Sequence, residues 1–141
     1  MLKAVLVGRH RLLKKQIDDL RRLGIDEIVN VLSLPEDRSL LEDLVGRWVN
    51  GGVRYVVVQA LPLRVLKELW DVCRSRGVSV LIARMESVGL AESEDKAKRL
   101  VSELPDSRTY IKGVQDRAYR VIEFKYWEKI KELKVILEPV K

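Results

Sequence analysis

The sequence predicts an α/β fold in which a mostly parallel sheet of four strands carries a C-terminal antiparallel β extension. Over the first ninety residues, apolar β-branched segments alternate with amphipathic helical patterns, and glycine follows the first three helices. The third apolar segment has no polar alternation, as expected for a strand that is covered on both faces. Beyond residue 105, alternating segments replace this rhythm, which is typical of antiparallel strands with one face in water.

Each expected element follows from a local pattern of apolar residues and of helix-capping residues. The strands are expected at 3–7, 27–32, 54–59 and 78–83, where apolar side chains run together. The first helix is expected at 11–23, and the second begins at a capping box of Ser39 and Glu42 and ends at Gly51. The third is expected from Pro62 to Gly77, and the fourth from a Ser93 cap to Pro105.

Right-handed crossovers between these parallel strands predict a Rossmann-like (flavodoxin-like) three-layer core, and the common strand order is 2-1-3-4. Residues 1–105 form this core, and residues 106–141 add strands at 109–112, 119–126 and 134–138. No linker-like segment separates the two parts, so we expect residues 1–141 to be a single domain. Trp48, Trp70 and Cys73 lie on apolar helical stripes and are expected in the core.

The composition excludes several classes of protein. Of the 141 residues, 47% are hydrophobic and 34% are charged, which excludes a disordered or collagen-like chain. The single cysteine excludes a disulfide scaffold and favours the cytoplasm, and no apolar run approaches the length of a membrane span. One threonine, few amides and many charges suit a thermophile, although drift in a GC-rich genome explains the same bias.

The motifs of common nucleotide enzymes and metalloproteins are absent from the sequence. Gly8 stands alone before Arg9, so the glycine-rich dinucleotide fingerprint is missing after the first strand, and no phosphate-binding loop occurs. One histidine and one cysteine do not make a zinc site, and no acidic run resembles a calcium loop. We therefore expect no metal and no cofactor.

The unusual feature is the charge at two helix starts. Acids are favoured at a helix N-terminus because the helix dipole is positive there, and bases are disfavoured. The expected first helix nevertheless begins among Arg9, Arg11, Lys14 and Lys15, and the third begins with Arg64 and Lys67. Such violations of a local rule are typical of functional sites. The alternative is that these bases are solvated and paired with Asp18, Asp19 and Glu68 one turn later.

The expected topology brings the two helix starts together. In an open parallel sheet, ligands bind beyond the carboxyl ends of the strands where the strand order reverses, here between the first and third strands. The sequence thus predicts a binding module for an anionic ligand, a nucleotide or oligonucleotide, acting as a sensor or accessory factor. The ligand-binding residues would be Arg9, His10, Arg11 and Gln59, with Arg64 strengthening the field.

An enzyme at the same crevice is the first alternative. His10 as the acid–base group and Glu86 as its partner, at the end of the fourth strand, would suit a metal-independent phosphodiesterase-type hydrolase. A structural ion pair between Glu86 and Arg84 is the competing interpretation. The sequence does not decide whether any reaction is catalysed.

The C-terminal part favours a second alternative. Bases alternate there with aromatic side chains, as in proteins that bind nucleic acid, and Arg117, Arg120 and Lys125 would contact the phosphates. Its apolar side chains, such as Tyr119 and Val121, also need a cover, which is either the fourth helix or a second copy of the chain. Cover by a second copy of the chain predicts a homodimer.

Overall fold

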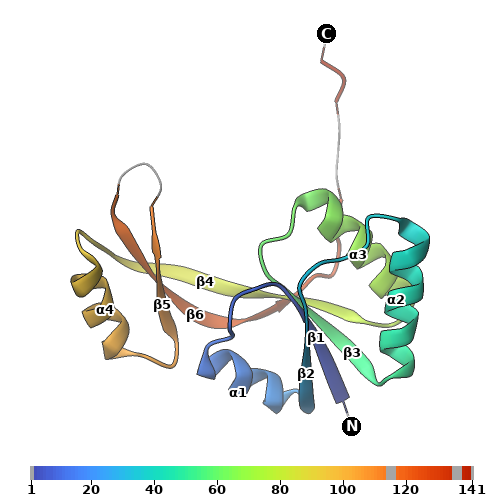
Figure 1. Ribbon diagram of the computed structural model, residues 1–141, viewed down its shortest axis with the longest axis horizontal. Helices are drawn as coiled ribbons and strands as arrows, with labels where there is room; N and C mark the ends of the chain where they lie inside the picture. The colour runs from blue at the N-terminus through green and yellow to red at the C-terminus, as the bar shows by residue number, and fades with distance from the viewer. Residues whose placement is uncertain (1, 114–116, 135–137, 141) are drawn as a thin grey trace. The chain divides into compact units, whose positions relative to one another are not determined.

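The computed structural model describes residues 2–113, 117–134 and 138–140, and these form six strands and four helices (Figure 1). The strands are β1 (Leu2–Val7), β2 (Ile25–Val31), β3 (Val53–Val58), β4 (Ser79–Ala91), β5 (Arg108–Lys112) and β6 (Tyr119–Lys129). The helices are α1 (Lys14–Arg22), α2 (Arg38–Asn50), α3 (Leu63–Ser75) and α4 (Glu94–Glu103). The predicted strand at 134–138 lies largely outside the described residues.

The chain divides into two compact units. The first unit consists of residues 1–9, 25–82 and 129–141, and the second of residues 10–24 and 83–128. Strands β4 and β6 contribute residues to both units. That residues 1–141 behave as a single domain stays a prediction.

The strands form one sheet in the order β2-β1-β3-β4-β6-β5. Strand β1 pairs in parallel with β2 and β3, and β3 with β4, whereas β5 and β6 are antiparallel. The α/β class and the parallel pairing of the first four strands are confirmed, and these four strands follow the common order β2-β1-β3-β4. The sheet has six strands instead of the four predicted for its core, because β6 lies between β4 and β5 in the same sheet. The antiparallel pairing predicted for the C-terminal extension is confirmed for β5 and β6.

The difference arises chiefly at β4, which runs to Ala91 instead of ending at Ala83. Its second half contains Ser87 and Gly89, which have low strand propensity and make the segment look like a turn in the sequence. Glu86 therefore lies within a strand, and its predicted position at a strand end is wrong.

The core of the first unit lies between its strands and the two helices α2 and α3, which pack against each other (Figure 1). Val56 of β3 is fully buried, as are Val45 of α2 and Leu69 of α3. Trp70 and Cys73 belong to this core as predicted, and Trp48 packs against it while partly exposed. Burial raises the pKa of the Cys73 thiol to about 12.

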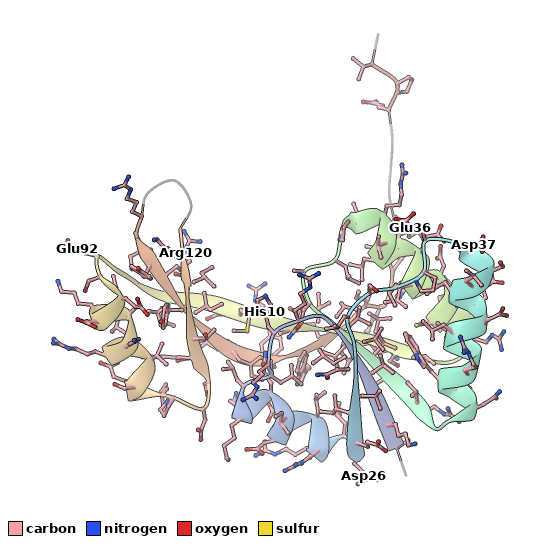
Figure 2. All side chains as sticks on the ribbon, in the orientation of Figure 1. His10, Asp26, Glu36, Asp37, Glu92 and Arg120 are labelled. Atoms are coloured by element: carbon pink, nitrogen blue, oxygen red, sulfur yellow. The ribbon has the colours of Figure 1, made fainter. Side chains whose placement is uncertain are left out.

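The start of α2 differs from the prediction. Its cap is Asp37, whose carboxylate accepts hydrogen bonds from the backbone N–H of Ser39 (2.8 Å) and Leu40 (3.2 Å) (Figure 2). The Ser39 hydroxyl donates to the same carboxylate, and this bond is the largest cause that holds the pKa of Asp37 below its ordinary value. Glu42 pairs with Arg38 at 3.2 Å and does not complete a capping box. The predicted Ser93 cap of α4 is confirmed.

In the second unit α4 covers the hairpin of β5 and β6. Val121 of β6 is fully buried with Ala97 of α4, and Tyr110 and Tyr119 pack against them with their ring centroids 5.9 Å apart. Of the two covers considered for these side chains, the structure shows the fourth helix. The homodimer stays a prediction. None of the helices in the described residues is long and apolar enough to cross a membrane.

Candidate functional site

The carboxyl ends of β1 and β3 lie side by side in the first unit. Val7 and Val58 are register partners at these ends, and the backbone N–H of Gln59 donates to the Val7 carbonyl at 3.1 Å. The N–H of Gly8 donates to the carbonyl of Val31, at the end of β2, also at 3.1 Å. Because β1 lies between β2 and β3, the strand order reverses here, where an open parallel sheet offers a ligand site.

The backbone has two special conformations at this edge. Gly8 has φ +155°, and a Cβ added to it would lie 2.8 Å from the Cβ of Gln59, closer than real side chains come. Ala60, directly after Gln59, has φ +41°, which is the left-handed region that non-glycine residues seldom adopt. Strained residues of this kind tend to gather at binding sites, where the surrounding structure holds them in place.

Two arginines flank this edge in the first unit. Arg9 follows Gly8, and Arg64 is the second residue of α3, whose first turn contains no acid and whose cap residue, Pro62, makes no side-chain cap. Both arginine side chains are exposed. Within the described part of the chain, neither of them takes part in an ion pair of 4 Å or less.

The two lysines at the start of α1 are engaged within the second unit. Lys14 pairs with Asp18 at 3.0 Å, and the hydrogen bond from Lys14 to this carboxylate raises the pKa of the lysine. Lys15 donates to the carbonyl of Lys125 at 2.9 Å and lies 5.2 Å from the ring centroid of Phe124. These lysines therefore serve the packing of the second unit.

The predicted pairing of the basic residues with nearby acids is thus correct for Asp18, but Asp19 and Glu68 have other partners. The helix α1 also begins three residues later than predicted, so Arg11 precedes it. Asp19 pairs with Arg22 (3.5 Å), and Glu68 pairs with Arg38 (3.2 Å). Lys67, near the start of α3, pairs with Asp71 (3.1 Å).

His10, labelled in Figure 2, and Arg11 come next in the chain after Arg9 and belong to the second unit. Both side chains are exposed. The first unit by itself therefore contains Arg9, Gln59 and the start of α3, while the contribution of His10 and Arg11 stays a prediction.

Sequence reasoning placed Gly8, Gln59 and Ala60 at this edge through the topology, but it did not predict the positive φ of Ala60. A lone glycine after the first strand is a visible signal of an unusual backbone. An alanine with positive φ has no such signal, because its residue type favours an ordinary conformation.

Glu86, the partner proposed for His10 in an enzyme, has a different neighbour. It is exposed within β4, and its charge contributes to raising the pKa of Lys125, although the largest cause is the hydrogen bond between Lys125 and Glu123. Glu86 thus acts electrostatically on a lysine of β6. A catalytic pair of His10 and Glu86 stays a prediction.

The three bases proposed to contact nucleic acid are not equivalent. Arg117 and Arg120 are exposed, and Arg120 lies on β6 next to the hairpin turn (Figure 2). Lys125 contacts the carboxylate of Glu123, which is 8% exposed and also accepts from Arg108 at 2.9 Å. The charge of Lys125 is therefore largely compensated within the second unit.

Replacing Glu123 by glutamine is expected to lower the free energy of unfolding by about 2 kcal/mol, because it leaves two bases without their shared carboxylate. Hydrogen bonds from Lys125 and then Arg108 lower the pKa of Glu123 from its ordinary 4.5. The stabilisation is therefore present above pH 4.5 and is lost as the pH falls through the lowered pKa. Urea unfolding of Glu123→Gln between pH 3 and pH 7 measures both effects.

The control for this variant is Glu92→Gln, since Glu92 is 93% exposed and lies 3.9 Å from Lys96. It should leave both the stability and its pH dependence unchanged. If Glu123→Gln retains the acid-induced loss of stability seen in the wild type, the ion cluster is not its cause.

In the described part of the chain, no three side chains of His, Cys, Asp or Glu form a group that could hold a metal ion. Comparison of the chain with models of protein families, with curated proteins and with solved structures found no match. The functional argument therefore depends on the residues themselves.

Proposed function

We propose that this protein is a binding module for an anionic ligand, a nucleotide or oligonucleotide, in a sensor or accessory role. The ligand would bind beyond the carboxyl ends of β1 and β3. One observation carries the proposal: Gly8, closely approached by Gln59, and Ala60, with φ +41°, lie where the strand order reverses. The exposed Arg9 and Arg64 flank this edge and have no ion-pair partner within the described chain.

The chemistry of this edge suits phosphate. The guanidinium groups of Arg9 and Arg64 present planar pairs of N–H donors that match two phosphate oxygens. The first turn of α3 adds the partial positive charge of a helix N-terminus, which no acid in that turn neutralises. Gln59 lies against Gly8 at this edge, and its side chain is an amide that can both donate and accept hydrogen bonds.

His10 and Arg11 would extend the same positive region, since they follow Arg9 directly in the chain. The contribution of His10 and Arg11 to ligand binding stays a prediction with this proposal.

A thermal-shift screen tests the proposal. Nucleoside mono-, di- and triphosphates, cyclic and linear oligonucleotides and inorganic phosphate are each added to the full chain, because a ligand that binds only the folded state raises the melting temperature. Arg64→Gln should weaken binding of the stabilising ligand by about tenfold or more, since it removes charge-assisted hydrogen bonds.

Arg47→Gln is the matched control. Arg47 is an exposed arginine in the last turn of α2, so this variant removes the same charge from a helix C-terminus of the first unit. It should bind as the wild type does. The absence of stabilisation by any member of the screen, or equal losses in the two variants, would argue against binding at this edge.

His10→Ala separates the binding module from the hydrolase. A binding module should keep most of its affinity, whereas an enzyme that uses His10 as its acid–base group should lose turnover by about 100-fold or more.

Binding through the hairpin has its own signature, because affinity for DNA or RNA must fall steeply as salt displaces the protein from phosphates. Lys125 would contribute little to that slope, since Glu123 already compensates its charge.

A further inference from the structure

The first unit has a hollow of about 310 Å³ at the amino end of β4. Its walls come from the last turns of α3, from Gly77 to Val80, and from the segment that follows β6. This is the opposite end of α3 from Arg64, and ten residues of helix place Arg74 about 15 Å away from Arg64 along the axis. The hollow is therefore separate from the edge proposed above.

Cations dominate the charge of this hollow. Among the described residues that line it, three are basic, Arg74, Lys129 and Lys131, and none is acidic. All three are exposed residues, and within the described chain none of them forms an ion pair of 4 Å or less. The hollow therefore carries three positive charges that no carboxylate in its lining offsets.

The surroundings order Arg74 and the backbone that carries the two lysines. The guanidinium carbon of Arg74 lies 5.3 Å from the ring centroid of Trp70, which is 4% exposed. The Trp70 indole N–H donates to the carbonyl of Ile130 at 3.2 Å, and the N–H of Ile130 donates to the carbonyl of Val80 at 3.0 Å. These two bonds fix the backbone between Lys129 and Lys131, so ordering that segment costs a ligand little.

The cations are not needed to cap α3. Lysine and arginine near a helix C-terminus often donate to its last carbonyls. Here those carbonyls already accept other bonds: Val72 from the Ser75 hydroxyl at 2.8 Å, Cys73 from the N–H of Val78 at 2.9 Å, and Arg74 from the N–H of Gly77 at 3.3 Å. The side-chain donors of Arg74 thus remain available to a ligand.

We propose that this hollow binds a phosphate group, either free phosphate or the phosphate of a small organic monoester. Arginine offers paired donors to two oxygens, the lysines supply point charges, and Ser79 is also among the lining residues. A volume of about 310 Å³ is at the small end of ligand sites and suits a phosphate or a small monoester. The apolar walls of Val78, Val80 and Ile130 would contact the organic part of a monoester.

Titration of the ¹⁵N-labelled full chain by NMR tests this site. Inorganic phosphate, ribose 5-phosphate and AMP are the probes, and adenosine is the uncharged control. The readout is the indole N–H signal of Trp70, assigned with Trp70→Phe, together with the amides of Ser79 and Ile130. Saturable shifts are expected with phosphate-bearing probes and not with adenosine. Tighter binding of the monoesters identifies an organic phosphate as the source, and equal or tighter binding of inorganic phosphate identifies the free ion.

Charge variants give the decisive comparison. Arg74→Gln, and the double variant Lys129→Gln with Lys131→Gln, should each raise the dissociation constant by about tenfold or more. Lys67→Gln is the matched control, because Lys67 lies 4.9 Å from the same Trp70 ring but pairs with Asp71 and does not line the hollow. If Arg74→Gln does not fold, Arg74→Lys keeps the charge over Trp70 and tests the paired donors alone.

Two results would overturn the site: no saturable shift with any phosphate probe, or equal weakening by Lys67→Gln and Arg74→Gln. Arg64→Gln keeps the two proposals apart. It should leave the Trp70 response unchanged even if the edge at β1 and β3 binds a nucleotide, and loss of the Trp70 response in Arg64→Gln would show that the hollow is not an independent site.

Discussion

Phe124→Ala is expected to lower the free energy of unfolding by about 3–5 kcal/mol, the largest effect on stability that we predict. Phe124 is 1% exposed in β6, and its ring centroid lies 5.2 Å from that of Trp127. Lys15 lies over the same ring, and Trp127 donates to the carbonyl of Gln16 at 3.0 Å. The phenyl ring thus holds α1 against β6 within the second unit, and its removal leaves a cavity. Urea unfolding measures the loss.

Tyr126→Ala is the control for this prediction. Tyr126 is an aromatic residue of the same strand but is 54% exposed, so its removal creates no cavity and should leave stability unchanged. If residues 1–141 are one domain, Phe124→Ala should also reduce the hydrogen-exchange protection of α3, in the first unit. If Phe124→Ala and Tyr126→Ala lower the free energy of unfolding equally, the burial of Phe124 is not the cause of its effect.

Gly8→Ala is expected to lower the free energy of unfolding by about 3 kcal/mol, because two costs add. A side chain at φ +155° is strained, and its Cβ would overlap Gln59, whose own Cβ is 2.8 Å away. Gly77→Ala separates the costs, since Gly77 has φ +73° with no heavy atom within 4 Å of an added Cβ. That variant should lose only about 1 kcal/mol, the cost of backbone strain alone.

A double-mutant cycle tests the steric part directly. In a Gln59→Gly background the overlap is absent, so Gly8→Ala should cost about as little as Gly77→Ala does. If Gly8→Ala remains as costly in that background as in the wild type, contact with Gln59 is not what requires glycine at the end of β1.

The fold was predictable wherever local pattern and tertiary structure agree. The uninterrupted apolar run of β3 correctly indicates a doubly covered strand, since Val56 and Val57 are fully buried. The predictions failed where two local signals compete. Asp37 and Ser39 are both good helix caps, and the choice depends on backbone geometry that the sequence does not display. Gly89 concealed the second half of β4, because strand pairing with distant residues overrides its low propensity.

For the candidate site, topology was predictable and charge pairing was not. The order of the first strands places Gly8 beside Gln59, as the sequence analysis expected. By contrast, Lys125 looks like a free base in the sequence. Its compensation depends on the register of the hairpin, in which Arg108 lies opposite Glu123, and such long-range pairing has no local signal.

The central claim is that an anion binds at the carboxyl ends of β1 and β3. The most direct test follows the amide NMR signals of the protein as it is titrated with the nucleotide that stabilises it most in the thermal-shift screen. The account predicts saturable shifts at Gly8, Arg9, Gln59 and Ala60 that weaken in Arg64→Gln but persist in Arg47→Gln. Saturable shifts confined to other regions, such as the hairpin of β5 and β6 or the hollow beside Trp70, with these four amides unchanged, would contradict it.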